Sequence, residues 1–252
     1  MVQIKEVYNS IKECLKKRSF KLFLFSLLFI AILNVFAYVI KNPFLNQCCL
    51  LAEGIFSIVL LFAMIAYSVK EAHLRLSKTD FIAIAGIIIC SFVVYIIVVS
   101  LRTSIYTWDH TTYFERMRYL TNKYSSSPIE GLRAWLFSGM QNDYGCFLTM
   151  FIYPLFFFTN GSIQSFIFSY FFTCTVPTMI ALYCFAKWAF FKVTDIKKDT
   201  IVSISIAVII SLLPLLHSAS IKGMPDVFGL TFARIILLLT LPYDFSRKDY
   251  KK

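Results

Sequence analysis

Apolar residues along this chain fall in long blocks that are separated by short charged segments. Most blocks are about 18 to 25 residues long, the length that an α-helix needs to cross ~30 Å of hydrocarbon. The pattern predicts an all-α fold: a polytopic transmembrane helical bundle that forms a single transmembrane domain over residues 1–252. The predicted spans are 20–40, 48–69, 81–101, 164–186, 200–217 and 226–243.

One further apolar stretch, residues 146–158, is ambiguous. It is short for crossing and contains Pro154, so it is either a short span or a helix that dips into one interface. Cytoplasmic segments hold an excess of Lys and Arg, and with six spans the inside segments carry 17 of these residues and the outside segments seven. We therefore predict six spans, both termini in the cytoplasm, and a large external loop at 102–163 in a multi-pass protein of the inner or plasma membrane.

Composition and charge support a membrane location and argue against nucleic acid as a partner. The chain is 58% hydrophobic and only 15% charged, with a formal net charge of +11. Its Lys and Arg residues flank the apolar blocks instead of forming a basic face with stacking aromatics, which argues against nucleic acid and for membrane lipids as partners. Residues 1–19 place apolar side chains at helical spacing among lysines, which predicts a cytoplasmic amphipathic helix.

The external loop contains a helix signal of its own. The string Ser-Pro-Ile-Glu at 127–130 is a capping box with proline at the first helical position. Apolar residues then recur at helical spacing from Ile129 to Met140, with Trp135 close by. This pattern predicts an amphipathic interfacial helix that lies along the outer membrane surface.

Three acidic residues of the predicted outer face have distinctive neighbours. Asp109 lies in Trp-Asp-His-Thr-Thr-Tyr-Phe at 108–114, and Asp143 lies in Asn-Asp-Tyr-Gly at 142–145. Asp226 follows Gly-Met-Pro at the start of the last predicted span. Each is also an ordinary residue for a turn or a helix cap, so the functional interpretation depends on all three lying on one face.

These strings, together with Gly-Met-Pro-Asp-Val-Phe-Gly-Leu at 223–230, resemble the GT-C type integral membrane glycosyltransferases that use polyprenyl-phosphate sugars, bacterial family 39-like. The resemblance covers about residues 100–245. It implies an inverting transfer of a hexosyl or pentosyl group from a polyprenyl-phosphate donor to a cell-surface glycan or lipid acceptor at the external membrane face. Members of that family usually have more spans, so we expect this chain to be an N-terminal portion of such an enzyme.

The resemblance also assigns roles to individual residues. Asp109 is the expected general base, and Asp143 and Asp226 are expected to share its site. Three side chains are candidates for binding the donor phosphate: Arg234, His110 and Lys222. No cofactor is required, a divalent cation stays open as an alternative, and no metal site is predicted because Asp109 with two histidines is weak evidence for one.

Two other classes of function remain open at this stage. In a non-enzymatic transporter or lipid-handling protein, Glu53, Asp226 and Arg234 would form a midplane binding or proton-relay site. In an assembly subunit, the chain would pack against a separate enzyme. A salt bridge from Arg234 to Glu53 or Asp226 is an alternative to phosphate binding.

Overall fold

The computed structural model describes residues 18–101, 109–141, 146–159, 161–193, 199–211 and 225–240, and every regular element in these ranges is a helix. The elements are α2 (Arg18–Ile40), α3 (Pro43–Glu71), α4 (Lys78–Leu101), α5 (Asp109–Ser126), α6 (Pro128–Gln141), α7 (Phe147–Phe156), α8 (Ile163–Tyr170), the π-helix η1 (Phe171–Thr175), α9 (Val176–Val193), α10 (Asp199–Ser211) and α12 (Pro225–Thr240). The all-α prediction is confirmed for this part of the chain. The helix predicted at 1–19 falls almost entirely outside it.

In the part of the chain that the structure describes, four helical stretches are long and apolar enough to cross a membrane: Lys21–Ile40, Pro43–Glu71, Lys78–Ile97 and Ile163–Phe191. Large apolar side chains are exposed on them, with Phe25 at 67% and Val39 at 70% on α2. Because so much contiguous apolar surface is unfavourable in water, lipid is the solvent of this protein. The six-span topology stays a prediction, because α10 and α12 are described over only 13 and 16 residues.

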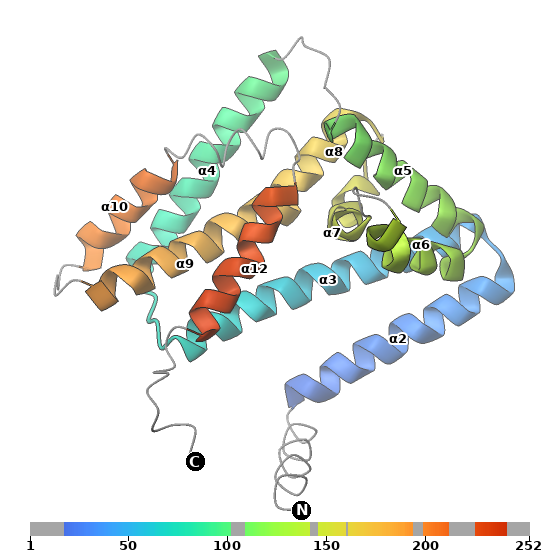
Figure 1. Cartoon of the computed structure of the whole chain (residues 1–252), viewed down its shortest axis with the longest axis horizontal. Coiled ribbons are helices and arrows are strands. Elements are labelled where there is room, and N and C mark those ends of the chain that lie inside the picture. Colours follow the sequence, from blue (N-terminus) through green and yellow to red (C-terminus); the bar gives the residue numbers. More distant parts are fainter. Residues whose placement is uncertain are drawn as a thin grey trace, which may run out of the picture.

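The helices divide into two groups at opposite ends of the molecule (Figure 1). Helices α5, α6 and α7 gather at the end where α2 finishes and α3 begins. At the other end, α3 finishes and α4 begins, and there α10 packs against α4 and α9. Helix α12 packs against α9 and α3. Helices α5, α6 and α7, which all come from the predicted external loop, therefore form one unit at one end of an apolar bundle. We call it the α5–α7 unit.

The turn between α2 and α3 is tighter than the sequence pattern predicts. Helix α3 begins at Pro43, five residues before the predicted start of its span, because Asn42 caps it and proline suits the first helical position. The Asn42 side chain accepts hydrogen bonds from the backbone N–H groups of Phe44 and Leu45. Lys41 completes the turn in the left-handed region at φ 56°.

The ambiguous apolar stretch forms the short helix α7. It has 10 residues, which is about 15 Å of helix and half of a hydrocarbon core. Nearly all of its side chains are buried against the rest of the protein. Gly54 of α3 permits the contact, because a Cβ atom there would lie 2.5 Å from the Met150 carbonyl oxygen and 2.6 Å from Pro154 Cγ. Its length fits the predicted alternative in which this stretch does not cross.

Candidate functional site

The predicted catalytic aspartates lie at helix starts or outside the described residues. Asp109 is the first residue of α5, and Asp226 is the second residue of α12; their side chains are not described. Asp143 lies outside the described residues. A carboxylate in the first turn of a helix is stabilised in its ionised form by the helix dipole. The positions of Asp109 and Asp226 are therefore electrostatically suited to an ionised carboxylate.

Among the predicted phosphate ligands, only Arg234 has a described side chain. Its Nη1 donates a hydrogen bond to the Leu230 carbonyl oxygen of its own helix at 2.8 Å. Among the carboxylates whose side chains are described, none lies at ion-pair distance from this guanidinium, so the alternative Glu53–Arg234 salt bridge is not formed. The alternative pairing with Asp226 falls outside the described side chains. The side chain of His110 is not described, and Lys222 lies outside the described residues.

A buried carboxylate, Glu53, joins three helices near the start of α3. Asn34 of α2 donates a hydrogen bond from Nδ2 to Glu53 Oε1 at 2.8 Å, and Tyr124 of α5 donates its phenol proton to Glu53 Oε2. We call Asn34, Glu53 and Tyr124 the Glu53 junction. Burial, followed by the charge of Glu53, raises the pKa of the Tyr124 phenol, so the phenol stays protonated and acts as the donor.

The surroundings of the Glu53 junction fix the α5–α7 unit to α3. Asn46 and Gln47 donate hydrogen bonds to the backbone oxygen and hydroxyl of Ser125, at 3.1 and 2.7 Å. Gly131 of α6 lies against the Tyr124 ring, where a Cβ atom would come within 2.2 Å of Cδ2. Helix α6 therefore packs this closely on α5 only because position 131 has no side chain. Helices α5 and α6 are held together at the end of the bundle where α3 begins.

A polar cleft opens between α5 and α6. It has a volume of about 230 Å³ and is lined by Arg116, Tyr119, Lys123, Glu130, Arg133, Ala134, Phe137 and Ser138. Lys123 lies over the Tyr119 ring, with its Nζ 5.6 Å from the ring centroid. We call this space the α5–α6 cleft. It carries three cations and one carboxylate, so its walls favour an anion.

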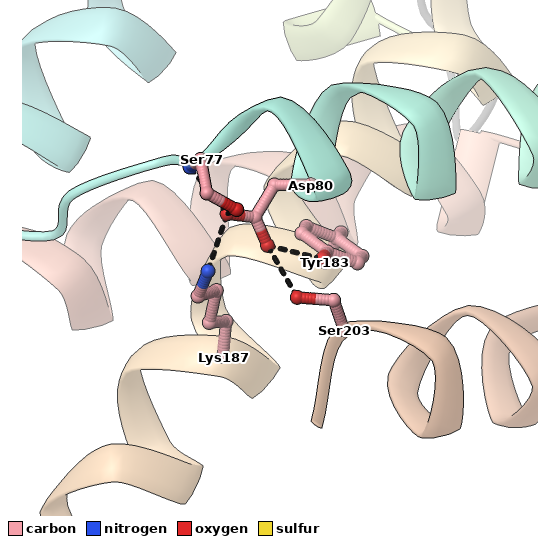
Figure 2. Close-up of polar contacts among 5 residues, drawn as sticks. All are labelled: Ser77, Asp80, Tyr183, Lys187 and Ser203. Carbon is pink, nitrogen blue, oxygen red and sulfur yellow. Dashed lines mark hydrogen bonds and ion pairs between the residues drawn. The ribbon is translucent and has the colours of Figure 1, made fainter. Parts of the chain in front are cut away.

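A second buried carboxylate, Asp80, holds the opposite end of the bundle together (Figure 2). Asp80 Oδ2 accepts from the backbone N–H and hydroxyl of Ser77 and from the Lys187 ammonium. Asp80 Oδ1 accepts from Tyr183 at 2.6 Å and from Ser203 at 2.7 Å. These five hydrogen bonds use the acceptor capacity of a carboxylate in full. This Asp80 cluster joins α4, α9 and α10 and leaves no lone pair for a ligand.

Sequence reasoning missed the partners of both carboxylates. The sequence pattern ends the span 164–186 before Lys187 and so predicts a loop position for it, yet Lys187 is 1% exposed and lies in α9. Tyr124 was not singled out at all. For Glu53 the available signal was a carboxylate inside an apolar block, since such a group needs a partner, but nothing in the local pattern identifies that partner. Asp80 lies just before the predicted span 81–101 and gives no such signal.

Comparisons of the chain with models of known protein families, with curated proteins and with solved structures found no match. Function is therefore inferred from the residues of this chain and their geometry.

Proposed function

We propose that this protein acts as a membrane glycosyltransferase, which transfers a sugar from a polyprenyl-phosphate donor to a cell-surface glycan or lipid acceptor at the external membrane face. The observation that carries the proposal is the short, buried helix α7. A helix of this length supports the topology in which α7 does not cross the membrane. In that six-span topology Asp226 lies on the same side as Asp109 and Asp143. A common site for these residues requires this arrangement.

Asp109 is the general base of the proposed reaction. As the acceptor hydroxyl oxygen bonds to the anomeric carbon, the Asp109 carboxylate takes the hydroxyl proton. The bond between the anomeric carbon and the phosphate oxygen breaks, and its electron pair leaves with the lipid phosphate. Attack opposite the leaving group inverts the configuration. Position 109 suits this role, because it begins a helix that buried contacts of Tyr124 hold in place.

The leaving phosphate needs cations, and we assign Arg234, His110 and Lys222 to it. Arg234 uses Nη1 for the Leu230 carbonyl, and a guanidinium has five N–H donors, so donors remain for phosphate oxygens. Lipid phosphate is a stable leaving group at neutral pH, so the reaction needs no separate carboxylic acid to protonate it.

The test compares the full chain with an Asp109→Asn variant in native membranes that supply endogenous acceptors. A panel of polyprenyl-phosphate hexoses and pentoses is added, and release of polyprenyl phosphate is measured by mass spectrometry. We expect the variant to lower the release at least ~100-fold, because the base is lost. Glu115→Gln is the matched control on the exposed side of α5 and should leave the release unchanged. Equal release by Asp109→Asn and the unmodified chain, or no release from any donor, contradicts the proposal.

A further inference from the structure

The α5–α6 cleft has the charge and shape of a site for a lipid phosphate. Arg116 and Lys123 are seven residues apart on α5, so their positions lie within about 20° on the helix surface. Arg133 faces them from α6, and Glu130 is the one acidic residue among the lining side chains. Two guanidinium groups and an ammonium around one cleft suit the several oxygens of a phosphate.

An apolar stripe runs along α6 beside this cleft. Ile129, Leu132 and Leu136 are 52, 37 and 55% exposed, and their spacing places them on one side of the helix. Arg133 follows Ile129 by one turn, at about 40° around the helix, so a cation borders the stripe. Cations beside an exposed apolar face are typical of helices that lie in the headgroup region of an anionic membrane.

The cleft is preformed and lies close to the ends of membrane-spanning helices. The Glu53 junction and the Gly131–Tyr124 contact hold α5 and α6 against each other and against α3. Helix α6 also packs on α2 and α3, two of the four stretches able to cross a membrane. A lipid that extends its chains along α6 could therefore reach the cleft with its headgroup without any rearrangement of the protein.

The distance along α5 separates this cleft from the proposed reaction. Position 109 is about 10 Å from position 116 along the helix axis and about 21 Å from position 123. A general base works within about 3 Å of the acceptor hydroxyl, and the leaving phosphate is bonded to the carbon that this hydroxyl attacks. The middle of the cleft is too distant from Asp109 for that phosphate, so it is a second site.

We propose that the α5–α6 cleft binds the phosphate headgroup of an anionic glycerophospholipid of the surrounding bilayer, with the α6 stripe among its acyl chains. Arg116, Lys123 and Arg133 donate charge-assisted hydrogen bonds to the phosphate oxygens. The site anchors the α5–α7 unit to the membrane surface. It is independent of the glycosyl transfer proposed above, since binding requires neither Asp109 nor a sugar donor.

The test measures retained lipid by native mass spectrometry. The full chain is reconstituted in nanodiscs of phosphatidylcholine mixed with phosphatidylglycerol, transferred to detergent, and analysed for bound phosphatidylglycerol. We expect the double variant Arg116→Gln/Arg133→Gln to retain about tenfold less, which corresponds to about 1.4 kcal/mol of lost binding free energy. Arg118→Gln is the matched control, because Arg118 lies over the Phe114 ring at 6.0 Å and does not line the cleft; its retention should not change.

Separate arms identify the source of the phosphate. Equal retention by the double variant and the unmodified chain overturns the proposal. Displacement of phosphatidylglycerol by inorganic phosphate also overturns it, because the site would then recognise free anions without the apolar stripe. Retention of added polyprenyl phosphate in preference to phosphatidylglycerol assigns the cleft to the donor instead. Lys123→Gln, which removes one ammonium from the cleft wall, gives the same test if the double variant does not fold.

Discussion

Two buried carboxylates hold the two ends of this molecule, and they are satisfied in different ways. Asp80 pairs with the Lys187 ammonium and accepts four further hydrogen bonds from α9, α10 and its own helix start. The described partners of Glu53 are two neutral donors, Tyr124 and Asn34. Asn34 Oδ1 is buried beside it without a partner among the described residues. Asp80 therefore has all of its acceptor positions used and holds α4, α9 and α10 together, whereas Glu53 attaches the α5–α7 unit through fewer described donors.

The largest expected effect comes from removing the cation of the Asp80 cluster. Lys187→Met leaves the Asp80 carboxylate buried without its counter-ion, and we expect a loss of about 3–5 kcal/mol in the free energy of unfolding. Unfolding by SDS titration in detergent micelles measures it. The double variant Asp80→Asn/Lys187→Met should lose less than Lys187→Met alone, because no unpaired charge remains. A smaller loss for Lys187→Met than for the double variant would show that the ion pair does not clamp the bundle.

The next effect concerns the contact between α3 and α7. Gly54→Leu forces a side chain into the Met150 carbonyl and the Pro154 ring, and we expect a loss of about 3 kcal/mol. Gly86→Ala is the matched control in α4, because a Cβ atom there meets nothing within 4 Å. It should be neutral or stabilise the helix by up to about 1 kcal/mol. Equal unfolding curves for Gly54→Leu and Gly86→Ala would contradict the close packing of α7.

A smaller effect comes from the donor of the Glu53 junction. Tyr124→Phe keeps the ring against Gly131 and removes the hydroxyl, so Glu53 loses one of its two described donors. We expect a loss of about 1–3 kcal/mol in unfolding free energy. Because the attachment of α5 to α3 is then weaker, limited proteolysis should cut near the α5–α6 hairpin faster than in the unmodified chain. The same cleavage rate in both proteins would argue that the phenol is not part of the attachment.

The smallest effect distinguishes the two carboxylates directly. Glu53→Gln keeps an oxygen acceptor for Asn34 and an amide for the Tyr124 oxygen, so we expect a loss of less than about 1 kcal/mol. Asp80→Asn leaves the Lys187 ammonium buried and uncompensated, and it should cost several times more. The same SDS titration measures both losses in unfolding free energy. Comparable losses in the two variants would mean that Glu53, like Asp80, is ionised and paired with a cation.

The sequence predicted the local features well and the long-range contacts poorly. Apolar blocks of span length predicted the bounds of helices α2, α3 and α4 to within a few residues. The capping string also predicted the start of α6 at Pro128. These features depend on neighbours within one or two turns. Tyr124 lies 71 residues from Glu53, and Lys187 lies 107 residues from Asp80, so no local periodicity could identify these partners. The functional assignment, drawn from short strings, remains a proposal.

Whether α7 leaves its two flanking segments on the same side of the membrane is measured most directly by the accessibility of single cysteines on either side of it. The cysteines are placed in a cysteine-free background and labelled with a membrane-impermeant thiol reagent. Glu130→Cys and Gln164→Cys are exposed positions before and after α7, and Arg75→Cys lies between α3 and α4 at the opposite end. We expect positions 130 and 164 to react from outside intact cells, whereas position 75 should react only after permeabilisation. If 130 and 164 react from opposite sides, α7 crosses the membrane and Asp226 lies on the other side from Asp109 and Asp143, which contradicts the proposed shared external site.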